Sequence, residues 1–147
     1  GNSPKVLPLE RDFVIFKGKK MFGPITIPQD AVMLFNTVEL KAGTTAEDIE
    51  FTLGELCSIV KEEYKDDGFI AGQVFEYTGF ISDEGSVTEK IDVKPHVAIV
   101  TYWRSFEQHE RSHADKLFKE KFSELFDASD DIRELGYNNL WQGMAEE

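Results

Sequence analysis

Two histidines in the second half of the chain have a spacing that suits metal chemistry. His109 and His113 lie in the run His-Glu-Arg-Ser-His, which matches the pattern H-E-x-x-H. On a helix, side chains four residues apart point the same way, so the two imidazoles could share one metal ion. Glu110 would then be the general base of a zinc hydrolase.

This metal hypothesis lacks a third ligand, which a catalytic zinc site needs. Lys116 and Lys119 occupy the positions where the longer form of the motif has a glycine and a third histidine. Glu124 and Glu134 are conceivable ligands, but nothing in the sequence singles one out. Arg111 also places a positive charge inside the motif. We therefore expect no metal, and keep a zinc hydrolase using His109 and His113 as an alternative.

The second hypothesis is that the two histidines form the polar end of a small-molecule pocket. Asn36 falls on the more apolar face of an expected strand, where an amide without a partner would cost about 1–3 kcal/mol. A neutral imidazole beside it could remove a proton from a phenolic substrate. We predict His113 and Asn36 as catalytic residues, and His109, Tyr102 and Trp103 as ligand-binding residues. Structural packing of both histidines between helix and sheet is the plain alternative.

Hydrophobic periodicity supplies the elements that would position these residues. Alternating apolar residues predict strands at 31–40, 69–81, 95–103 and 137–144. Apolar residues spaced by three and four predict helices at 44–66 and 105–126. Thr44 with Glu47, and Ser105 with Gln108, fit capping boxes at the two helix starts. The order is strand, helix, strand, strand, helix, strand, which predicts a ferredoxin-like α+β fold with an antiparallel sheet.

The expected sheet has apolar residues on both faces, and two helices can cover only one. A homodimer that pairs the other face with the sheet of a second subunit would bury it. Four of the five prolines lie before residue 30. We therefore divide the chain into an N-terminal extension, 1–30, and a ferredoxin-like domain, 31–147.

The amino-acid composition limits the classes of partner that the protein can bind. The 147 residues carry a net charge of −12, which disfavours nucleic acid and anionic membrane surfaces. No apolar run reaches the ~18 residues of a membrane span. The single cysteine, Cys57, excludes an internal disulfide. The chain begins with glycine rather than methionine, which suggests a trimmed N-terminus and leaves localisation open between cytoplasm and export.

Two stretches give the chain a family resemblance. One is Val-Thr-Tyr-Trp-Arg-Ser at 100–105, which leads into the helix with His113; the other is Phe-Asn-Thr-Val-Glu-Leu-Lys-Ala-Gly-Thr-Thr-Ala-Glu-Asp-Ile at 35–49. Together they resemble the dimeric α/β-barrel superfamily. This group includes antibiotic-biosynthesis monooxygenase-like proteins, heme-degrading monooxygenases and stress-responsive barrel proteins. The resemblance covers about Val32 to Met144.

The resemblance implies a homodimeric barrel with a pocket between the helices and the sheet of each subunit. Asn36 matches the first-strand asparagine of the heme-degrading members, and His113 matches a helical histidine of the wider group. Ser112 and Phe122 stand where heme-degrading members have a tryptophan and the axial histidine. We therefore expect no cofactor, with heme on a shifted His109 or His113 as an alternative.

The implied function is that of a monooxygenase-like protein that binds a small apolar or aromatic molecule. A cofactor-independent oxygenase is the first hypothesis. A non-catalytic ligand-binding or stress-related barrel protein is the second, and the zinc hydrolase is the third. Fold alone does not choose among them.

Overall fold

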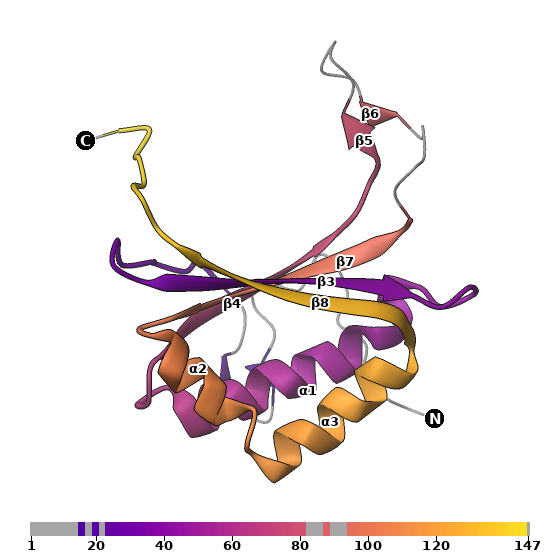
Figure 1. Ribbon diagram of the computed structural model, residues 1–147, viewed down its shortest axis with the longest axis horizontal. Helices are drawn as coiled ribbons and strands as arrows, with labels where there is room; N and C mark the ends of the chain where they lie inside the picture. Colours follow the sequence, from indigo (N-terminus) through magenta and orange to yellow (C-terminus); the bar gives the residue numbers. More distant parts are fainter. Residues whose placement is uncertain (1–14, 17–18, 21–22, 82–86, 89–93, 147) are drawn as a thin grey trace.

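The computed structural model describes residues 15–16, 19–20, 23–81, 87–88 and 94–146. Its centre is a four-stranded antiparallel sheet with the order β4-β7-β3-β8. Three helices lie on one face of this sheet, as Figure 1 shows. The strands of the sheet and the helices are β3 (Val32–Leu40), α1 (Ala46–Tyr64), β4 (Phe69–Glu76), β7 (His96–Trp103), α2 (Phe106–Ser112), α3 (Lys116–Asp127) and β8 (Ser129–Asn138).

This order and pairing confirm the ferredoxin-like α+β fold that the sequence predicts. Two small hairpins lie outside the sheet: β1 (Ile15–Phe16) with β2 (Lys19–Lys20), and β5 (Phe80–Ile81) with β6 (Val87–Thr88). Most of the segment 1–30 lies outside the described residues, as do residues 82–86 and 89–93. The division into an extension and a domain therefore stays a prediction.

The capping box of the first helix lies one residue later in the chain than predicted. The hydroxyl of Thr45 accepts a hydrogen bond from the amide of Asp48, whose carboxylate accepts one from the amide of Thr45. The box is thus Thr45 with Asp48, and not Thr44 with Glu47. After α1 the chain turns at Gly68, whose φ of 99° is the left-handed conformation expected there.

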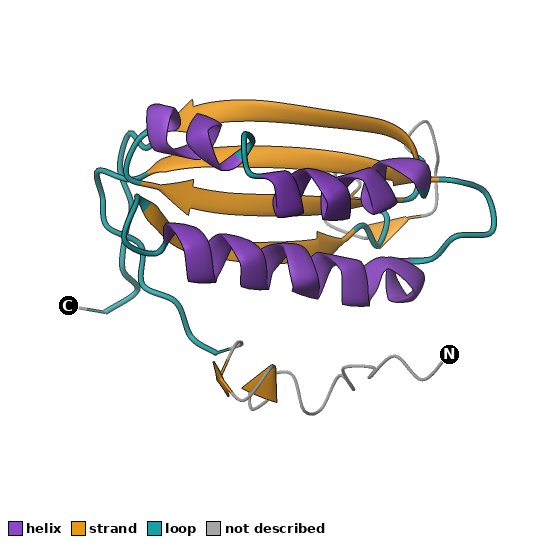
Figure 2. Cartoon of the chain, turned by 90° about the horizontal axis from the view of Figure 1, so that it is seen from below, coloured by secondary structure: helices purple, strands orange, loops and turns teal. Residues whose placement is uncertain are grey.

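The second predicted helix, 105–126, is wrong as one element. It is broken into α2 and α3 at residues 113–115 (Figure 2). The hydroxyl of Ser112 donates to the carbonyl of His109 at 2.6 Å, and a side chain bonded to helical backbone in this way competes with the helix. The carboxylate of Asp115 then accepts from the amide of Phe118 and caps the start of α3. Local hydrogen bonds thus favour a new helix over continuation of the first.

The predicted last strand, 137–144, is also misplaced, because β8 runs from Ser129 to Asn138. The sequence of β8 is rich in charged residues, which hides the apolar alternation by which a strand is predicted. It is an edge strand that pairs only with β3, and charged residues are common on edge strands. The predicted strand 69–81 likewise ends early: β4 stops at Glu76, and residues 77–79 lead to β5.

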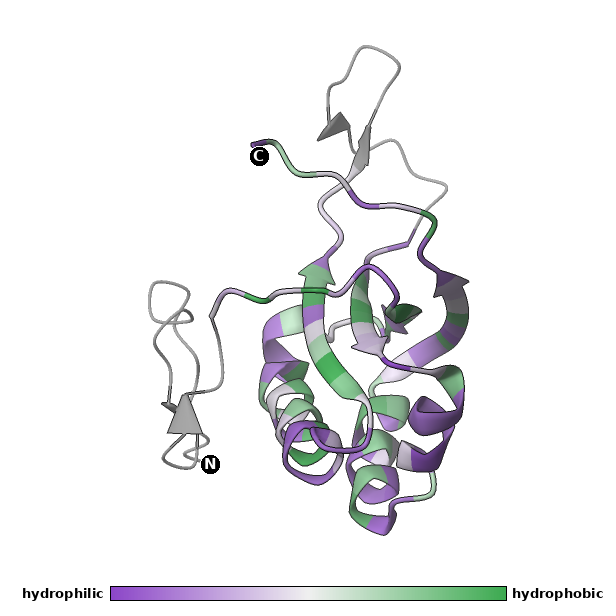
Figure 3. Ribbon diagram, turned by 90° about the vertical axis from the view of Figure 1, so that its left-hand side faces the viewer, coloured by the Kyte–Doolittle hydropathy of each residue, from purple (hydrophilic) through white to green (hydrophobic). Residues whose placement is uncertain are grey.

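The core lies between the sheet and the helices. One cluster of buried residues joins Val38 and Val97 of the sheet to Leu56 of α1 and Leu125 of α3. A second cluster, at the other end, is built on Trp103. In Figure 3 the helices mix hydrophilic and hydrophobic residues, as expected of helices with one buried face.

Within the part of the chain that the structure describes, no helix covers the opposite face of the sheet (Figure 1). Large apolar side chains remain about half exposed there: Phe75 at 49%, Leu135 at 50% and Tyr137 at 45%. Phe35 and Tyr137 meet edge to face on the same side. Among the described residues, no helix combines the length and the apolar character needed to span a membrane.

Candidate functional site

The two histidines of the H-E-x-x-H run meet at the break between α2 and α3. His109 is buried near the end of α2, and His113 is the residue that follows the helix. The φ of −69° and ψ of −16° at His113 keep it helical, so the spacing of one turn survives. The Nε2 atoms of the two rings lie 3.0 Å apart.

Glu134 of the edge strand brings a carboxylate to the same point. Its Oε2 lies 3.4 Å from Nε2 of His109, and its Oε1 lies 3.8 Å from Nε2 of His113. The side chain of Glu134 is 32% exposed. A carboxylate from β8 and two imidazoles from α2 and its C-terminal cap therefore converge, with one ligand atom of each within 4.8 Å of the others.

Asn36 connects this cluster to the centre of the sheet. It lies opposite Glu134 in the pairing of β3 with β8, and its side chain hydrogen-bonds to the Glu134 carboxylate. Nδ2 of Asn36 also donates to the carbonyl of Ile99 at 3.2 Å. The amide on the apolar face thus has partners, as its burial requires. We refer to His109, His113, Glu134 and Asn36 together as the polar cluster.

Aromatic rings fix the orientation of both imidazoles. Trp103, which is 1% exposed, meets the ring of His109 edge on with centroids 5.4 Å apart. Phe118 of α3 packs against the ring of His113 at the same centroid separation. Side chains held by packing in this way lose little further freedom when they bind a ligand.

The charged residues inside the histidine run point elsewhere. Arg111 forms two hydrogen bonds with the carboxylate of Asp67 and lies 3.6 Å from Glu107. Glu110 is exposed and does not belong to the group of converging ligand atoms. The structure therefore gives no support to Glu110 as general base, and it removes the objection that Arg111 opposes a cation.

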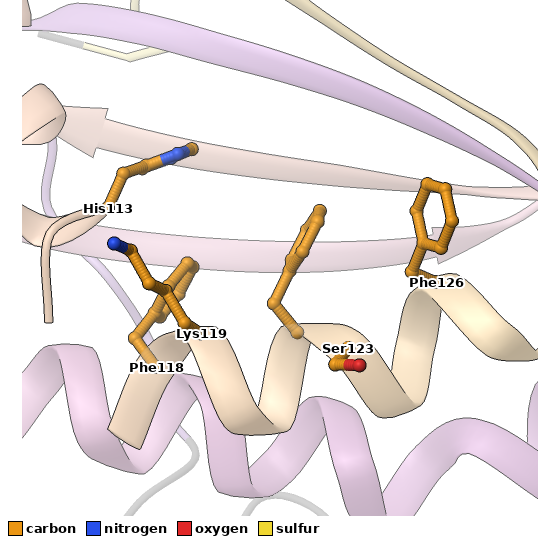
Figure 4. Close-up of a pocket in the computed structure, with 6 residues that line it drawn as sticks. His113, Phe118, Lys119, Ser123 and Phe126 are labelled. Carbon is orange, nitrogen blue, oxygen red and sulfur yellow. The ribbon is translucent and has the colours of Figure 1, made fainter. Parts of the chain in front are cut away.

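A groove opens beside the polar cluster. It has a volume of about 280 Å³ and is lined by His113, Phe118, Lys119, Phe122, Ser123 and Phe126. Figure 4 shows His113 at one end of this row and Phe126 at the other. Ring edges and faces from one side of α3 make most of the wall. The wall along α3 is therefore mainly aromatic, with Lys119 and Ser123 among the phenylalanines, and the groove ends at the imidazole of His113.

Burial and charge set the protonation of the cluster. Partial burial lowers the pKa of His113 below its ordinary value, although the Glu134 carboxylate opposes this effect. Burial acts to raise the pKa of Glu134, but hydrogen bonds from His109 and Asn36 and the adjacent imidazoles outweigh it, so that this pKa is lowered. At neutral pH the arrangement is a carboxylate held beside a neutral His113.

The predicted site residues are brought together only in part. His109, His113, Asn36 and Trp103 gather at the cluster. Tyr102 does not join them: it alternates with Trp103 on β7, so it lies on the uncovered face, where its hydroxyl donates to Gln73 at 2.8 Å. Sequence reasoning did not select Glu134, although its place opposite Asn36 would have identified it had the strand been assigned correctly.

Comparison with known proteins identifies proteins of the same fold but no family or close relative. No protein-family model matches the sequence, and no curated protein matches it. Among solved structures, SnoaB from Streptomyces nogalater, a cofactor-independent oxygenase, matches with a TM-score of 0.55 and 14% identity over 80% of this chain and 99% of its own. The At3g17210 protein of Arabidopsis thaliana matches with a TM-score of 0.59 and 13% identity over 77% and 99% of the two chains.

A dimeric protein of unknown function from Bacteroides fragilis also matches, with a TM-score of 0.50 and 7% identity over 77% and 99% of the chains. Its description names a ferredoxin-like fold. At such low identities these similarities show the fold alone. They confirm the resemblance to the dimeric α/β barrels as a likeness of fold, and the activity is a separate question.

Proposed function

We propose that the protein is an enzyme that binds a small apolar or aromatic molecule in the groove along α3, with His113 as its general base. One observation carries this proposal: three phenylalanine rings, Phe118, Phe122 and Phe126, line a groove that ends at a half-exposed imidazole. Its volume of about 280 Å³ is near the lower end of the ~300–1,000 Å³ of small-molecule pockets. A substrate of one or a few fused rings suits this space.

The reaction that fits is cofactor-independent oxygenation, the chemistry named for SnoaB. His113 takes a proton from a methylene that phenolic rings activate, and the carbanion then gives its electrons to dioxygen. The resulting hydroperoxide loses water and leaves a carbonyl. One oxygen atom enters the product and the other enters water, so R₂CH₂ and O₂ give R₂CO and H₂O. Asn36 acts through Glu134 as a positioning residue.

The experiment is an oxygen-electrode assay with a panel of anthrone-like and other phenolic substrates. The wild-type protein should consume one O₂ for each carbonyl formed. The variant His113→Ala should lose about 10²–10⁴-fold in kcat, the usual contribution of a general base. His96→Ala is the matched control, because His96 stacks on Tyr77 at the start of β7 and is not part of the cluster.

Equal turnover by His113→Ala and the wild type would contradict the base role. Ligand binding in the groove without O₂ uptake would favour the non-catalytic binding protein, the second hypothesis. The open position of His113, whose side chain is 45% exposed, is what favours that alternative. Fluorescence titration of the same panel measures binding separately from turnover.

We further propose that two copies of the chain pair through the uncovered face of the sheet. The half-exposed apolar side chains on that face, Phe75, Leu135 and Tyr137, support this proposal. The dimeric state named for the Bacteroides fragilis protein is consistent with it. Light scattering should give a dimer for the wild type and a monomer for Leu135→Glu. A monomeric wild type at micromolar concentration would overturn it.

A further inference from the structure

The geometry of the polar cluster fits a metal ion as well as a substrate. The Nε2 atoms of His109 and His113 lie 3.0 Å apart, and each faces a different oxygen of Glu134, at 3.4 Å from His109 and 3.8 Å from His113. Three ligands at about 2.0–2.1 Å from a tetrahedral zinc ion are about 3.3 Å apart. Small rotations of the Glu134 carboxylate would therefore bring all three atoms to bonding distance from one point.

The structure supplies a third metal ligand that the sequence alone does not identify. A catalytic metal site typically has three protein ligands and leaves a position for water or substrate. Glu134 supplies the third ligand that the histidine run lacks. Asn36 hydrogen-bonds to Glu134, and such outer partners hold ligands in place in known metal sites.

The charges around the cluster also permit a cation. Imidazoles bind a metal in their neutral form, so two imidazole ligands and one carboxylate ligand would bring a net charge of −1 to a divalent ion. The nearest arginine in the histidine run, Arg111, is paired with Asp67 and Glu107. Lys119, which also lines the groove, is exposed. No positive group therefore has to be buried beside the ion.

We propose that His109, His113 and Glu134 bind one divalent transition-metal ion. Nitrogen and carboxylate donors without sulfur suit zinc, manganese or ferrous iron, and Zn²⁺ is the probe. The open coordination position is on the side of His113, where the groove begins. The site differs from a zinc hydrolase of the H-E-x-x-H type, because Glu110 is exposed and outside it.

The proposal uses residues of the proposed function but does not rest on it. A neutral imidazole has one lone pair. When Nε2 of His113 holds a metal, the other nitrogen carries the proton, and no lone pair remains for a general base. Metal binding and the base role therefore exclude each other. Zn²⁺ would inhibit the cofactor-independent reaction by occupying its base.

The test is calorimetric titration of Zn²⁺ into chelator-treated, tag-free full-length protein. We expect one ion per chain. Glu134→Gln and His113→Ala should each weaken binding by more than 100-fold, beyond the ~10–100-fold typical of losing an outer-shell partner. Asn36→Ala should fall within that outer-shell range. Co²⁺ in place of Zn²⁺ should give visible absorption bands that Glu134→Gln abolishes.

Two matched controls separate this site from adventitious binding. Glu110→Gln removes a carboxylate of the same run, and His96→Ala removes the remaining histidine; both should bind Zn²⁺ like the wild type. No binding by the wild type below 100-fold molar excess would overturn the proposal. Equal loss in Glu110→Gln and Glu134→Gln would also overturn it. Because Glu134 and His113 are partly exposed, their variants should fold, which circular dichroism verifies.

The outcomes also distinguish this proposal from the proposed function. Zinc binding is measured without substrate, so an inactive protein that binds Zn²⁺ supports the metal site and removes the base role. An active protein that does not bind Zn²⁺ does the reverse. If both hold, adding Zn²⁺ should suppress O₂ uptake with the same dependence on concentration as the calorimetric titration.

Discussion

The two halves of the helical layer pack against the same sheet in different ways. One half is α1, a single helix of 19 residues that buries aliphatic side chains, among them Ile49, Leu56 and Val60. The other half is α2 and α3, which bury His109, Ser112 and Leu125. The first half builds a core. The second, interrupted at residues 113–115, builds a polar cluster and leaves a groove.

The difference shows what the interruption does for the site. His113 lies at the break, still at helical spacing from His109, and there it meets Glu134 of the edge strand. Beyond the break, α3 packs loosely enough that Phe126 remains 62% exposed. The site therefore depends on the residues that end α2 and start α3.

The largest effect should come from the side chain that anchors the interrupted half. Trp103→Ala removes a 1% exposed ring that contacts Tyr64, Phe69 and His109. We expect a loss of about 3–5 kcal/mol in the free energy of unfolding. Urea denaturation measures it, with the 76% exposed Trp141 replaced by alanine as the control. A loss under about 1 kcal/mol would mean that the ring is not a core element.

Capping variants compare the two halves directly. Asp115→Ala and Thr45→Ala each remove a helix cap, and each should lower the free energy of unfolding by about 0.5–2 kcal/mol. Asp115 also accepts a hydrogen bond from the hydroxyl of Tyr64. Only Asp115→Ala should in addition weaken ligand binding in the groove, because it loosens the break. If both variants bound the ligand equally well, the break between α2 and α3 would not be needed for ligand binding.

The smallest effect on stability should come from the groove wall. Phe126→Ala removes an exposed ring, so the free energy of unfolding should change by less than about 0.5 kcal/mol. Binding of an aromatic ligand should nevertheless weaken. Leu117→Ala is the control, since Leu117 is 51% exposed on the same helix but does not line the groove. Equal ligand affinity in the two variants would place the ligand elsewhere.

The sequence predicted the fold because the strongest patterns were long and regular. The alternation through β3 and β7 and the helical spacing of α1 define their elements without help from the rest of the chain. The break in the second helix was missed because Phe118 and Phe122 continue an apolar helical pattern across it. Hydrophobic periodicity does not reveal a helix cap such as Asp115, which starts α3 shortly after α2 has ended.

The sequence predicted only part of the candidate site, for a related reason. Asn36 and the two histidines were found because a polar residue on an apolar face needs a partner. Glu134 was considered as a conceivable ligand but not selected over Glu124, because β8 carries many charges and an edge strand with charges resembles a loop. Only the register of β3 with β8, which sets Asn36 opposite Glu134, distinguishes this carboxylate from its neighbours. Register between distant strands is not a property of local sequence.

The central claim is that the helix break and the edge strand create one site from His109, His113 and Glu134. The most direct test is a crystal of the chelator-treated protein soaked in Zn²⁺, with diffraction recorded at the zinc edge. We predict one anomalous peak per chain, about 2.0–2.2 Å from Nε2 of both histidines and from a carboxylate oxygen of Glu134. The absence of a peak there, with these three side chains well ordered, would contradict the account.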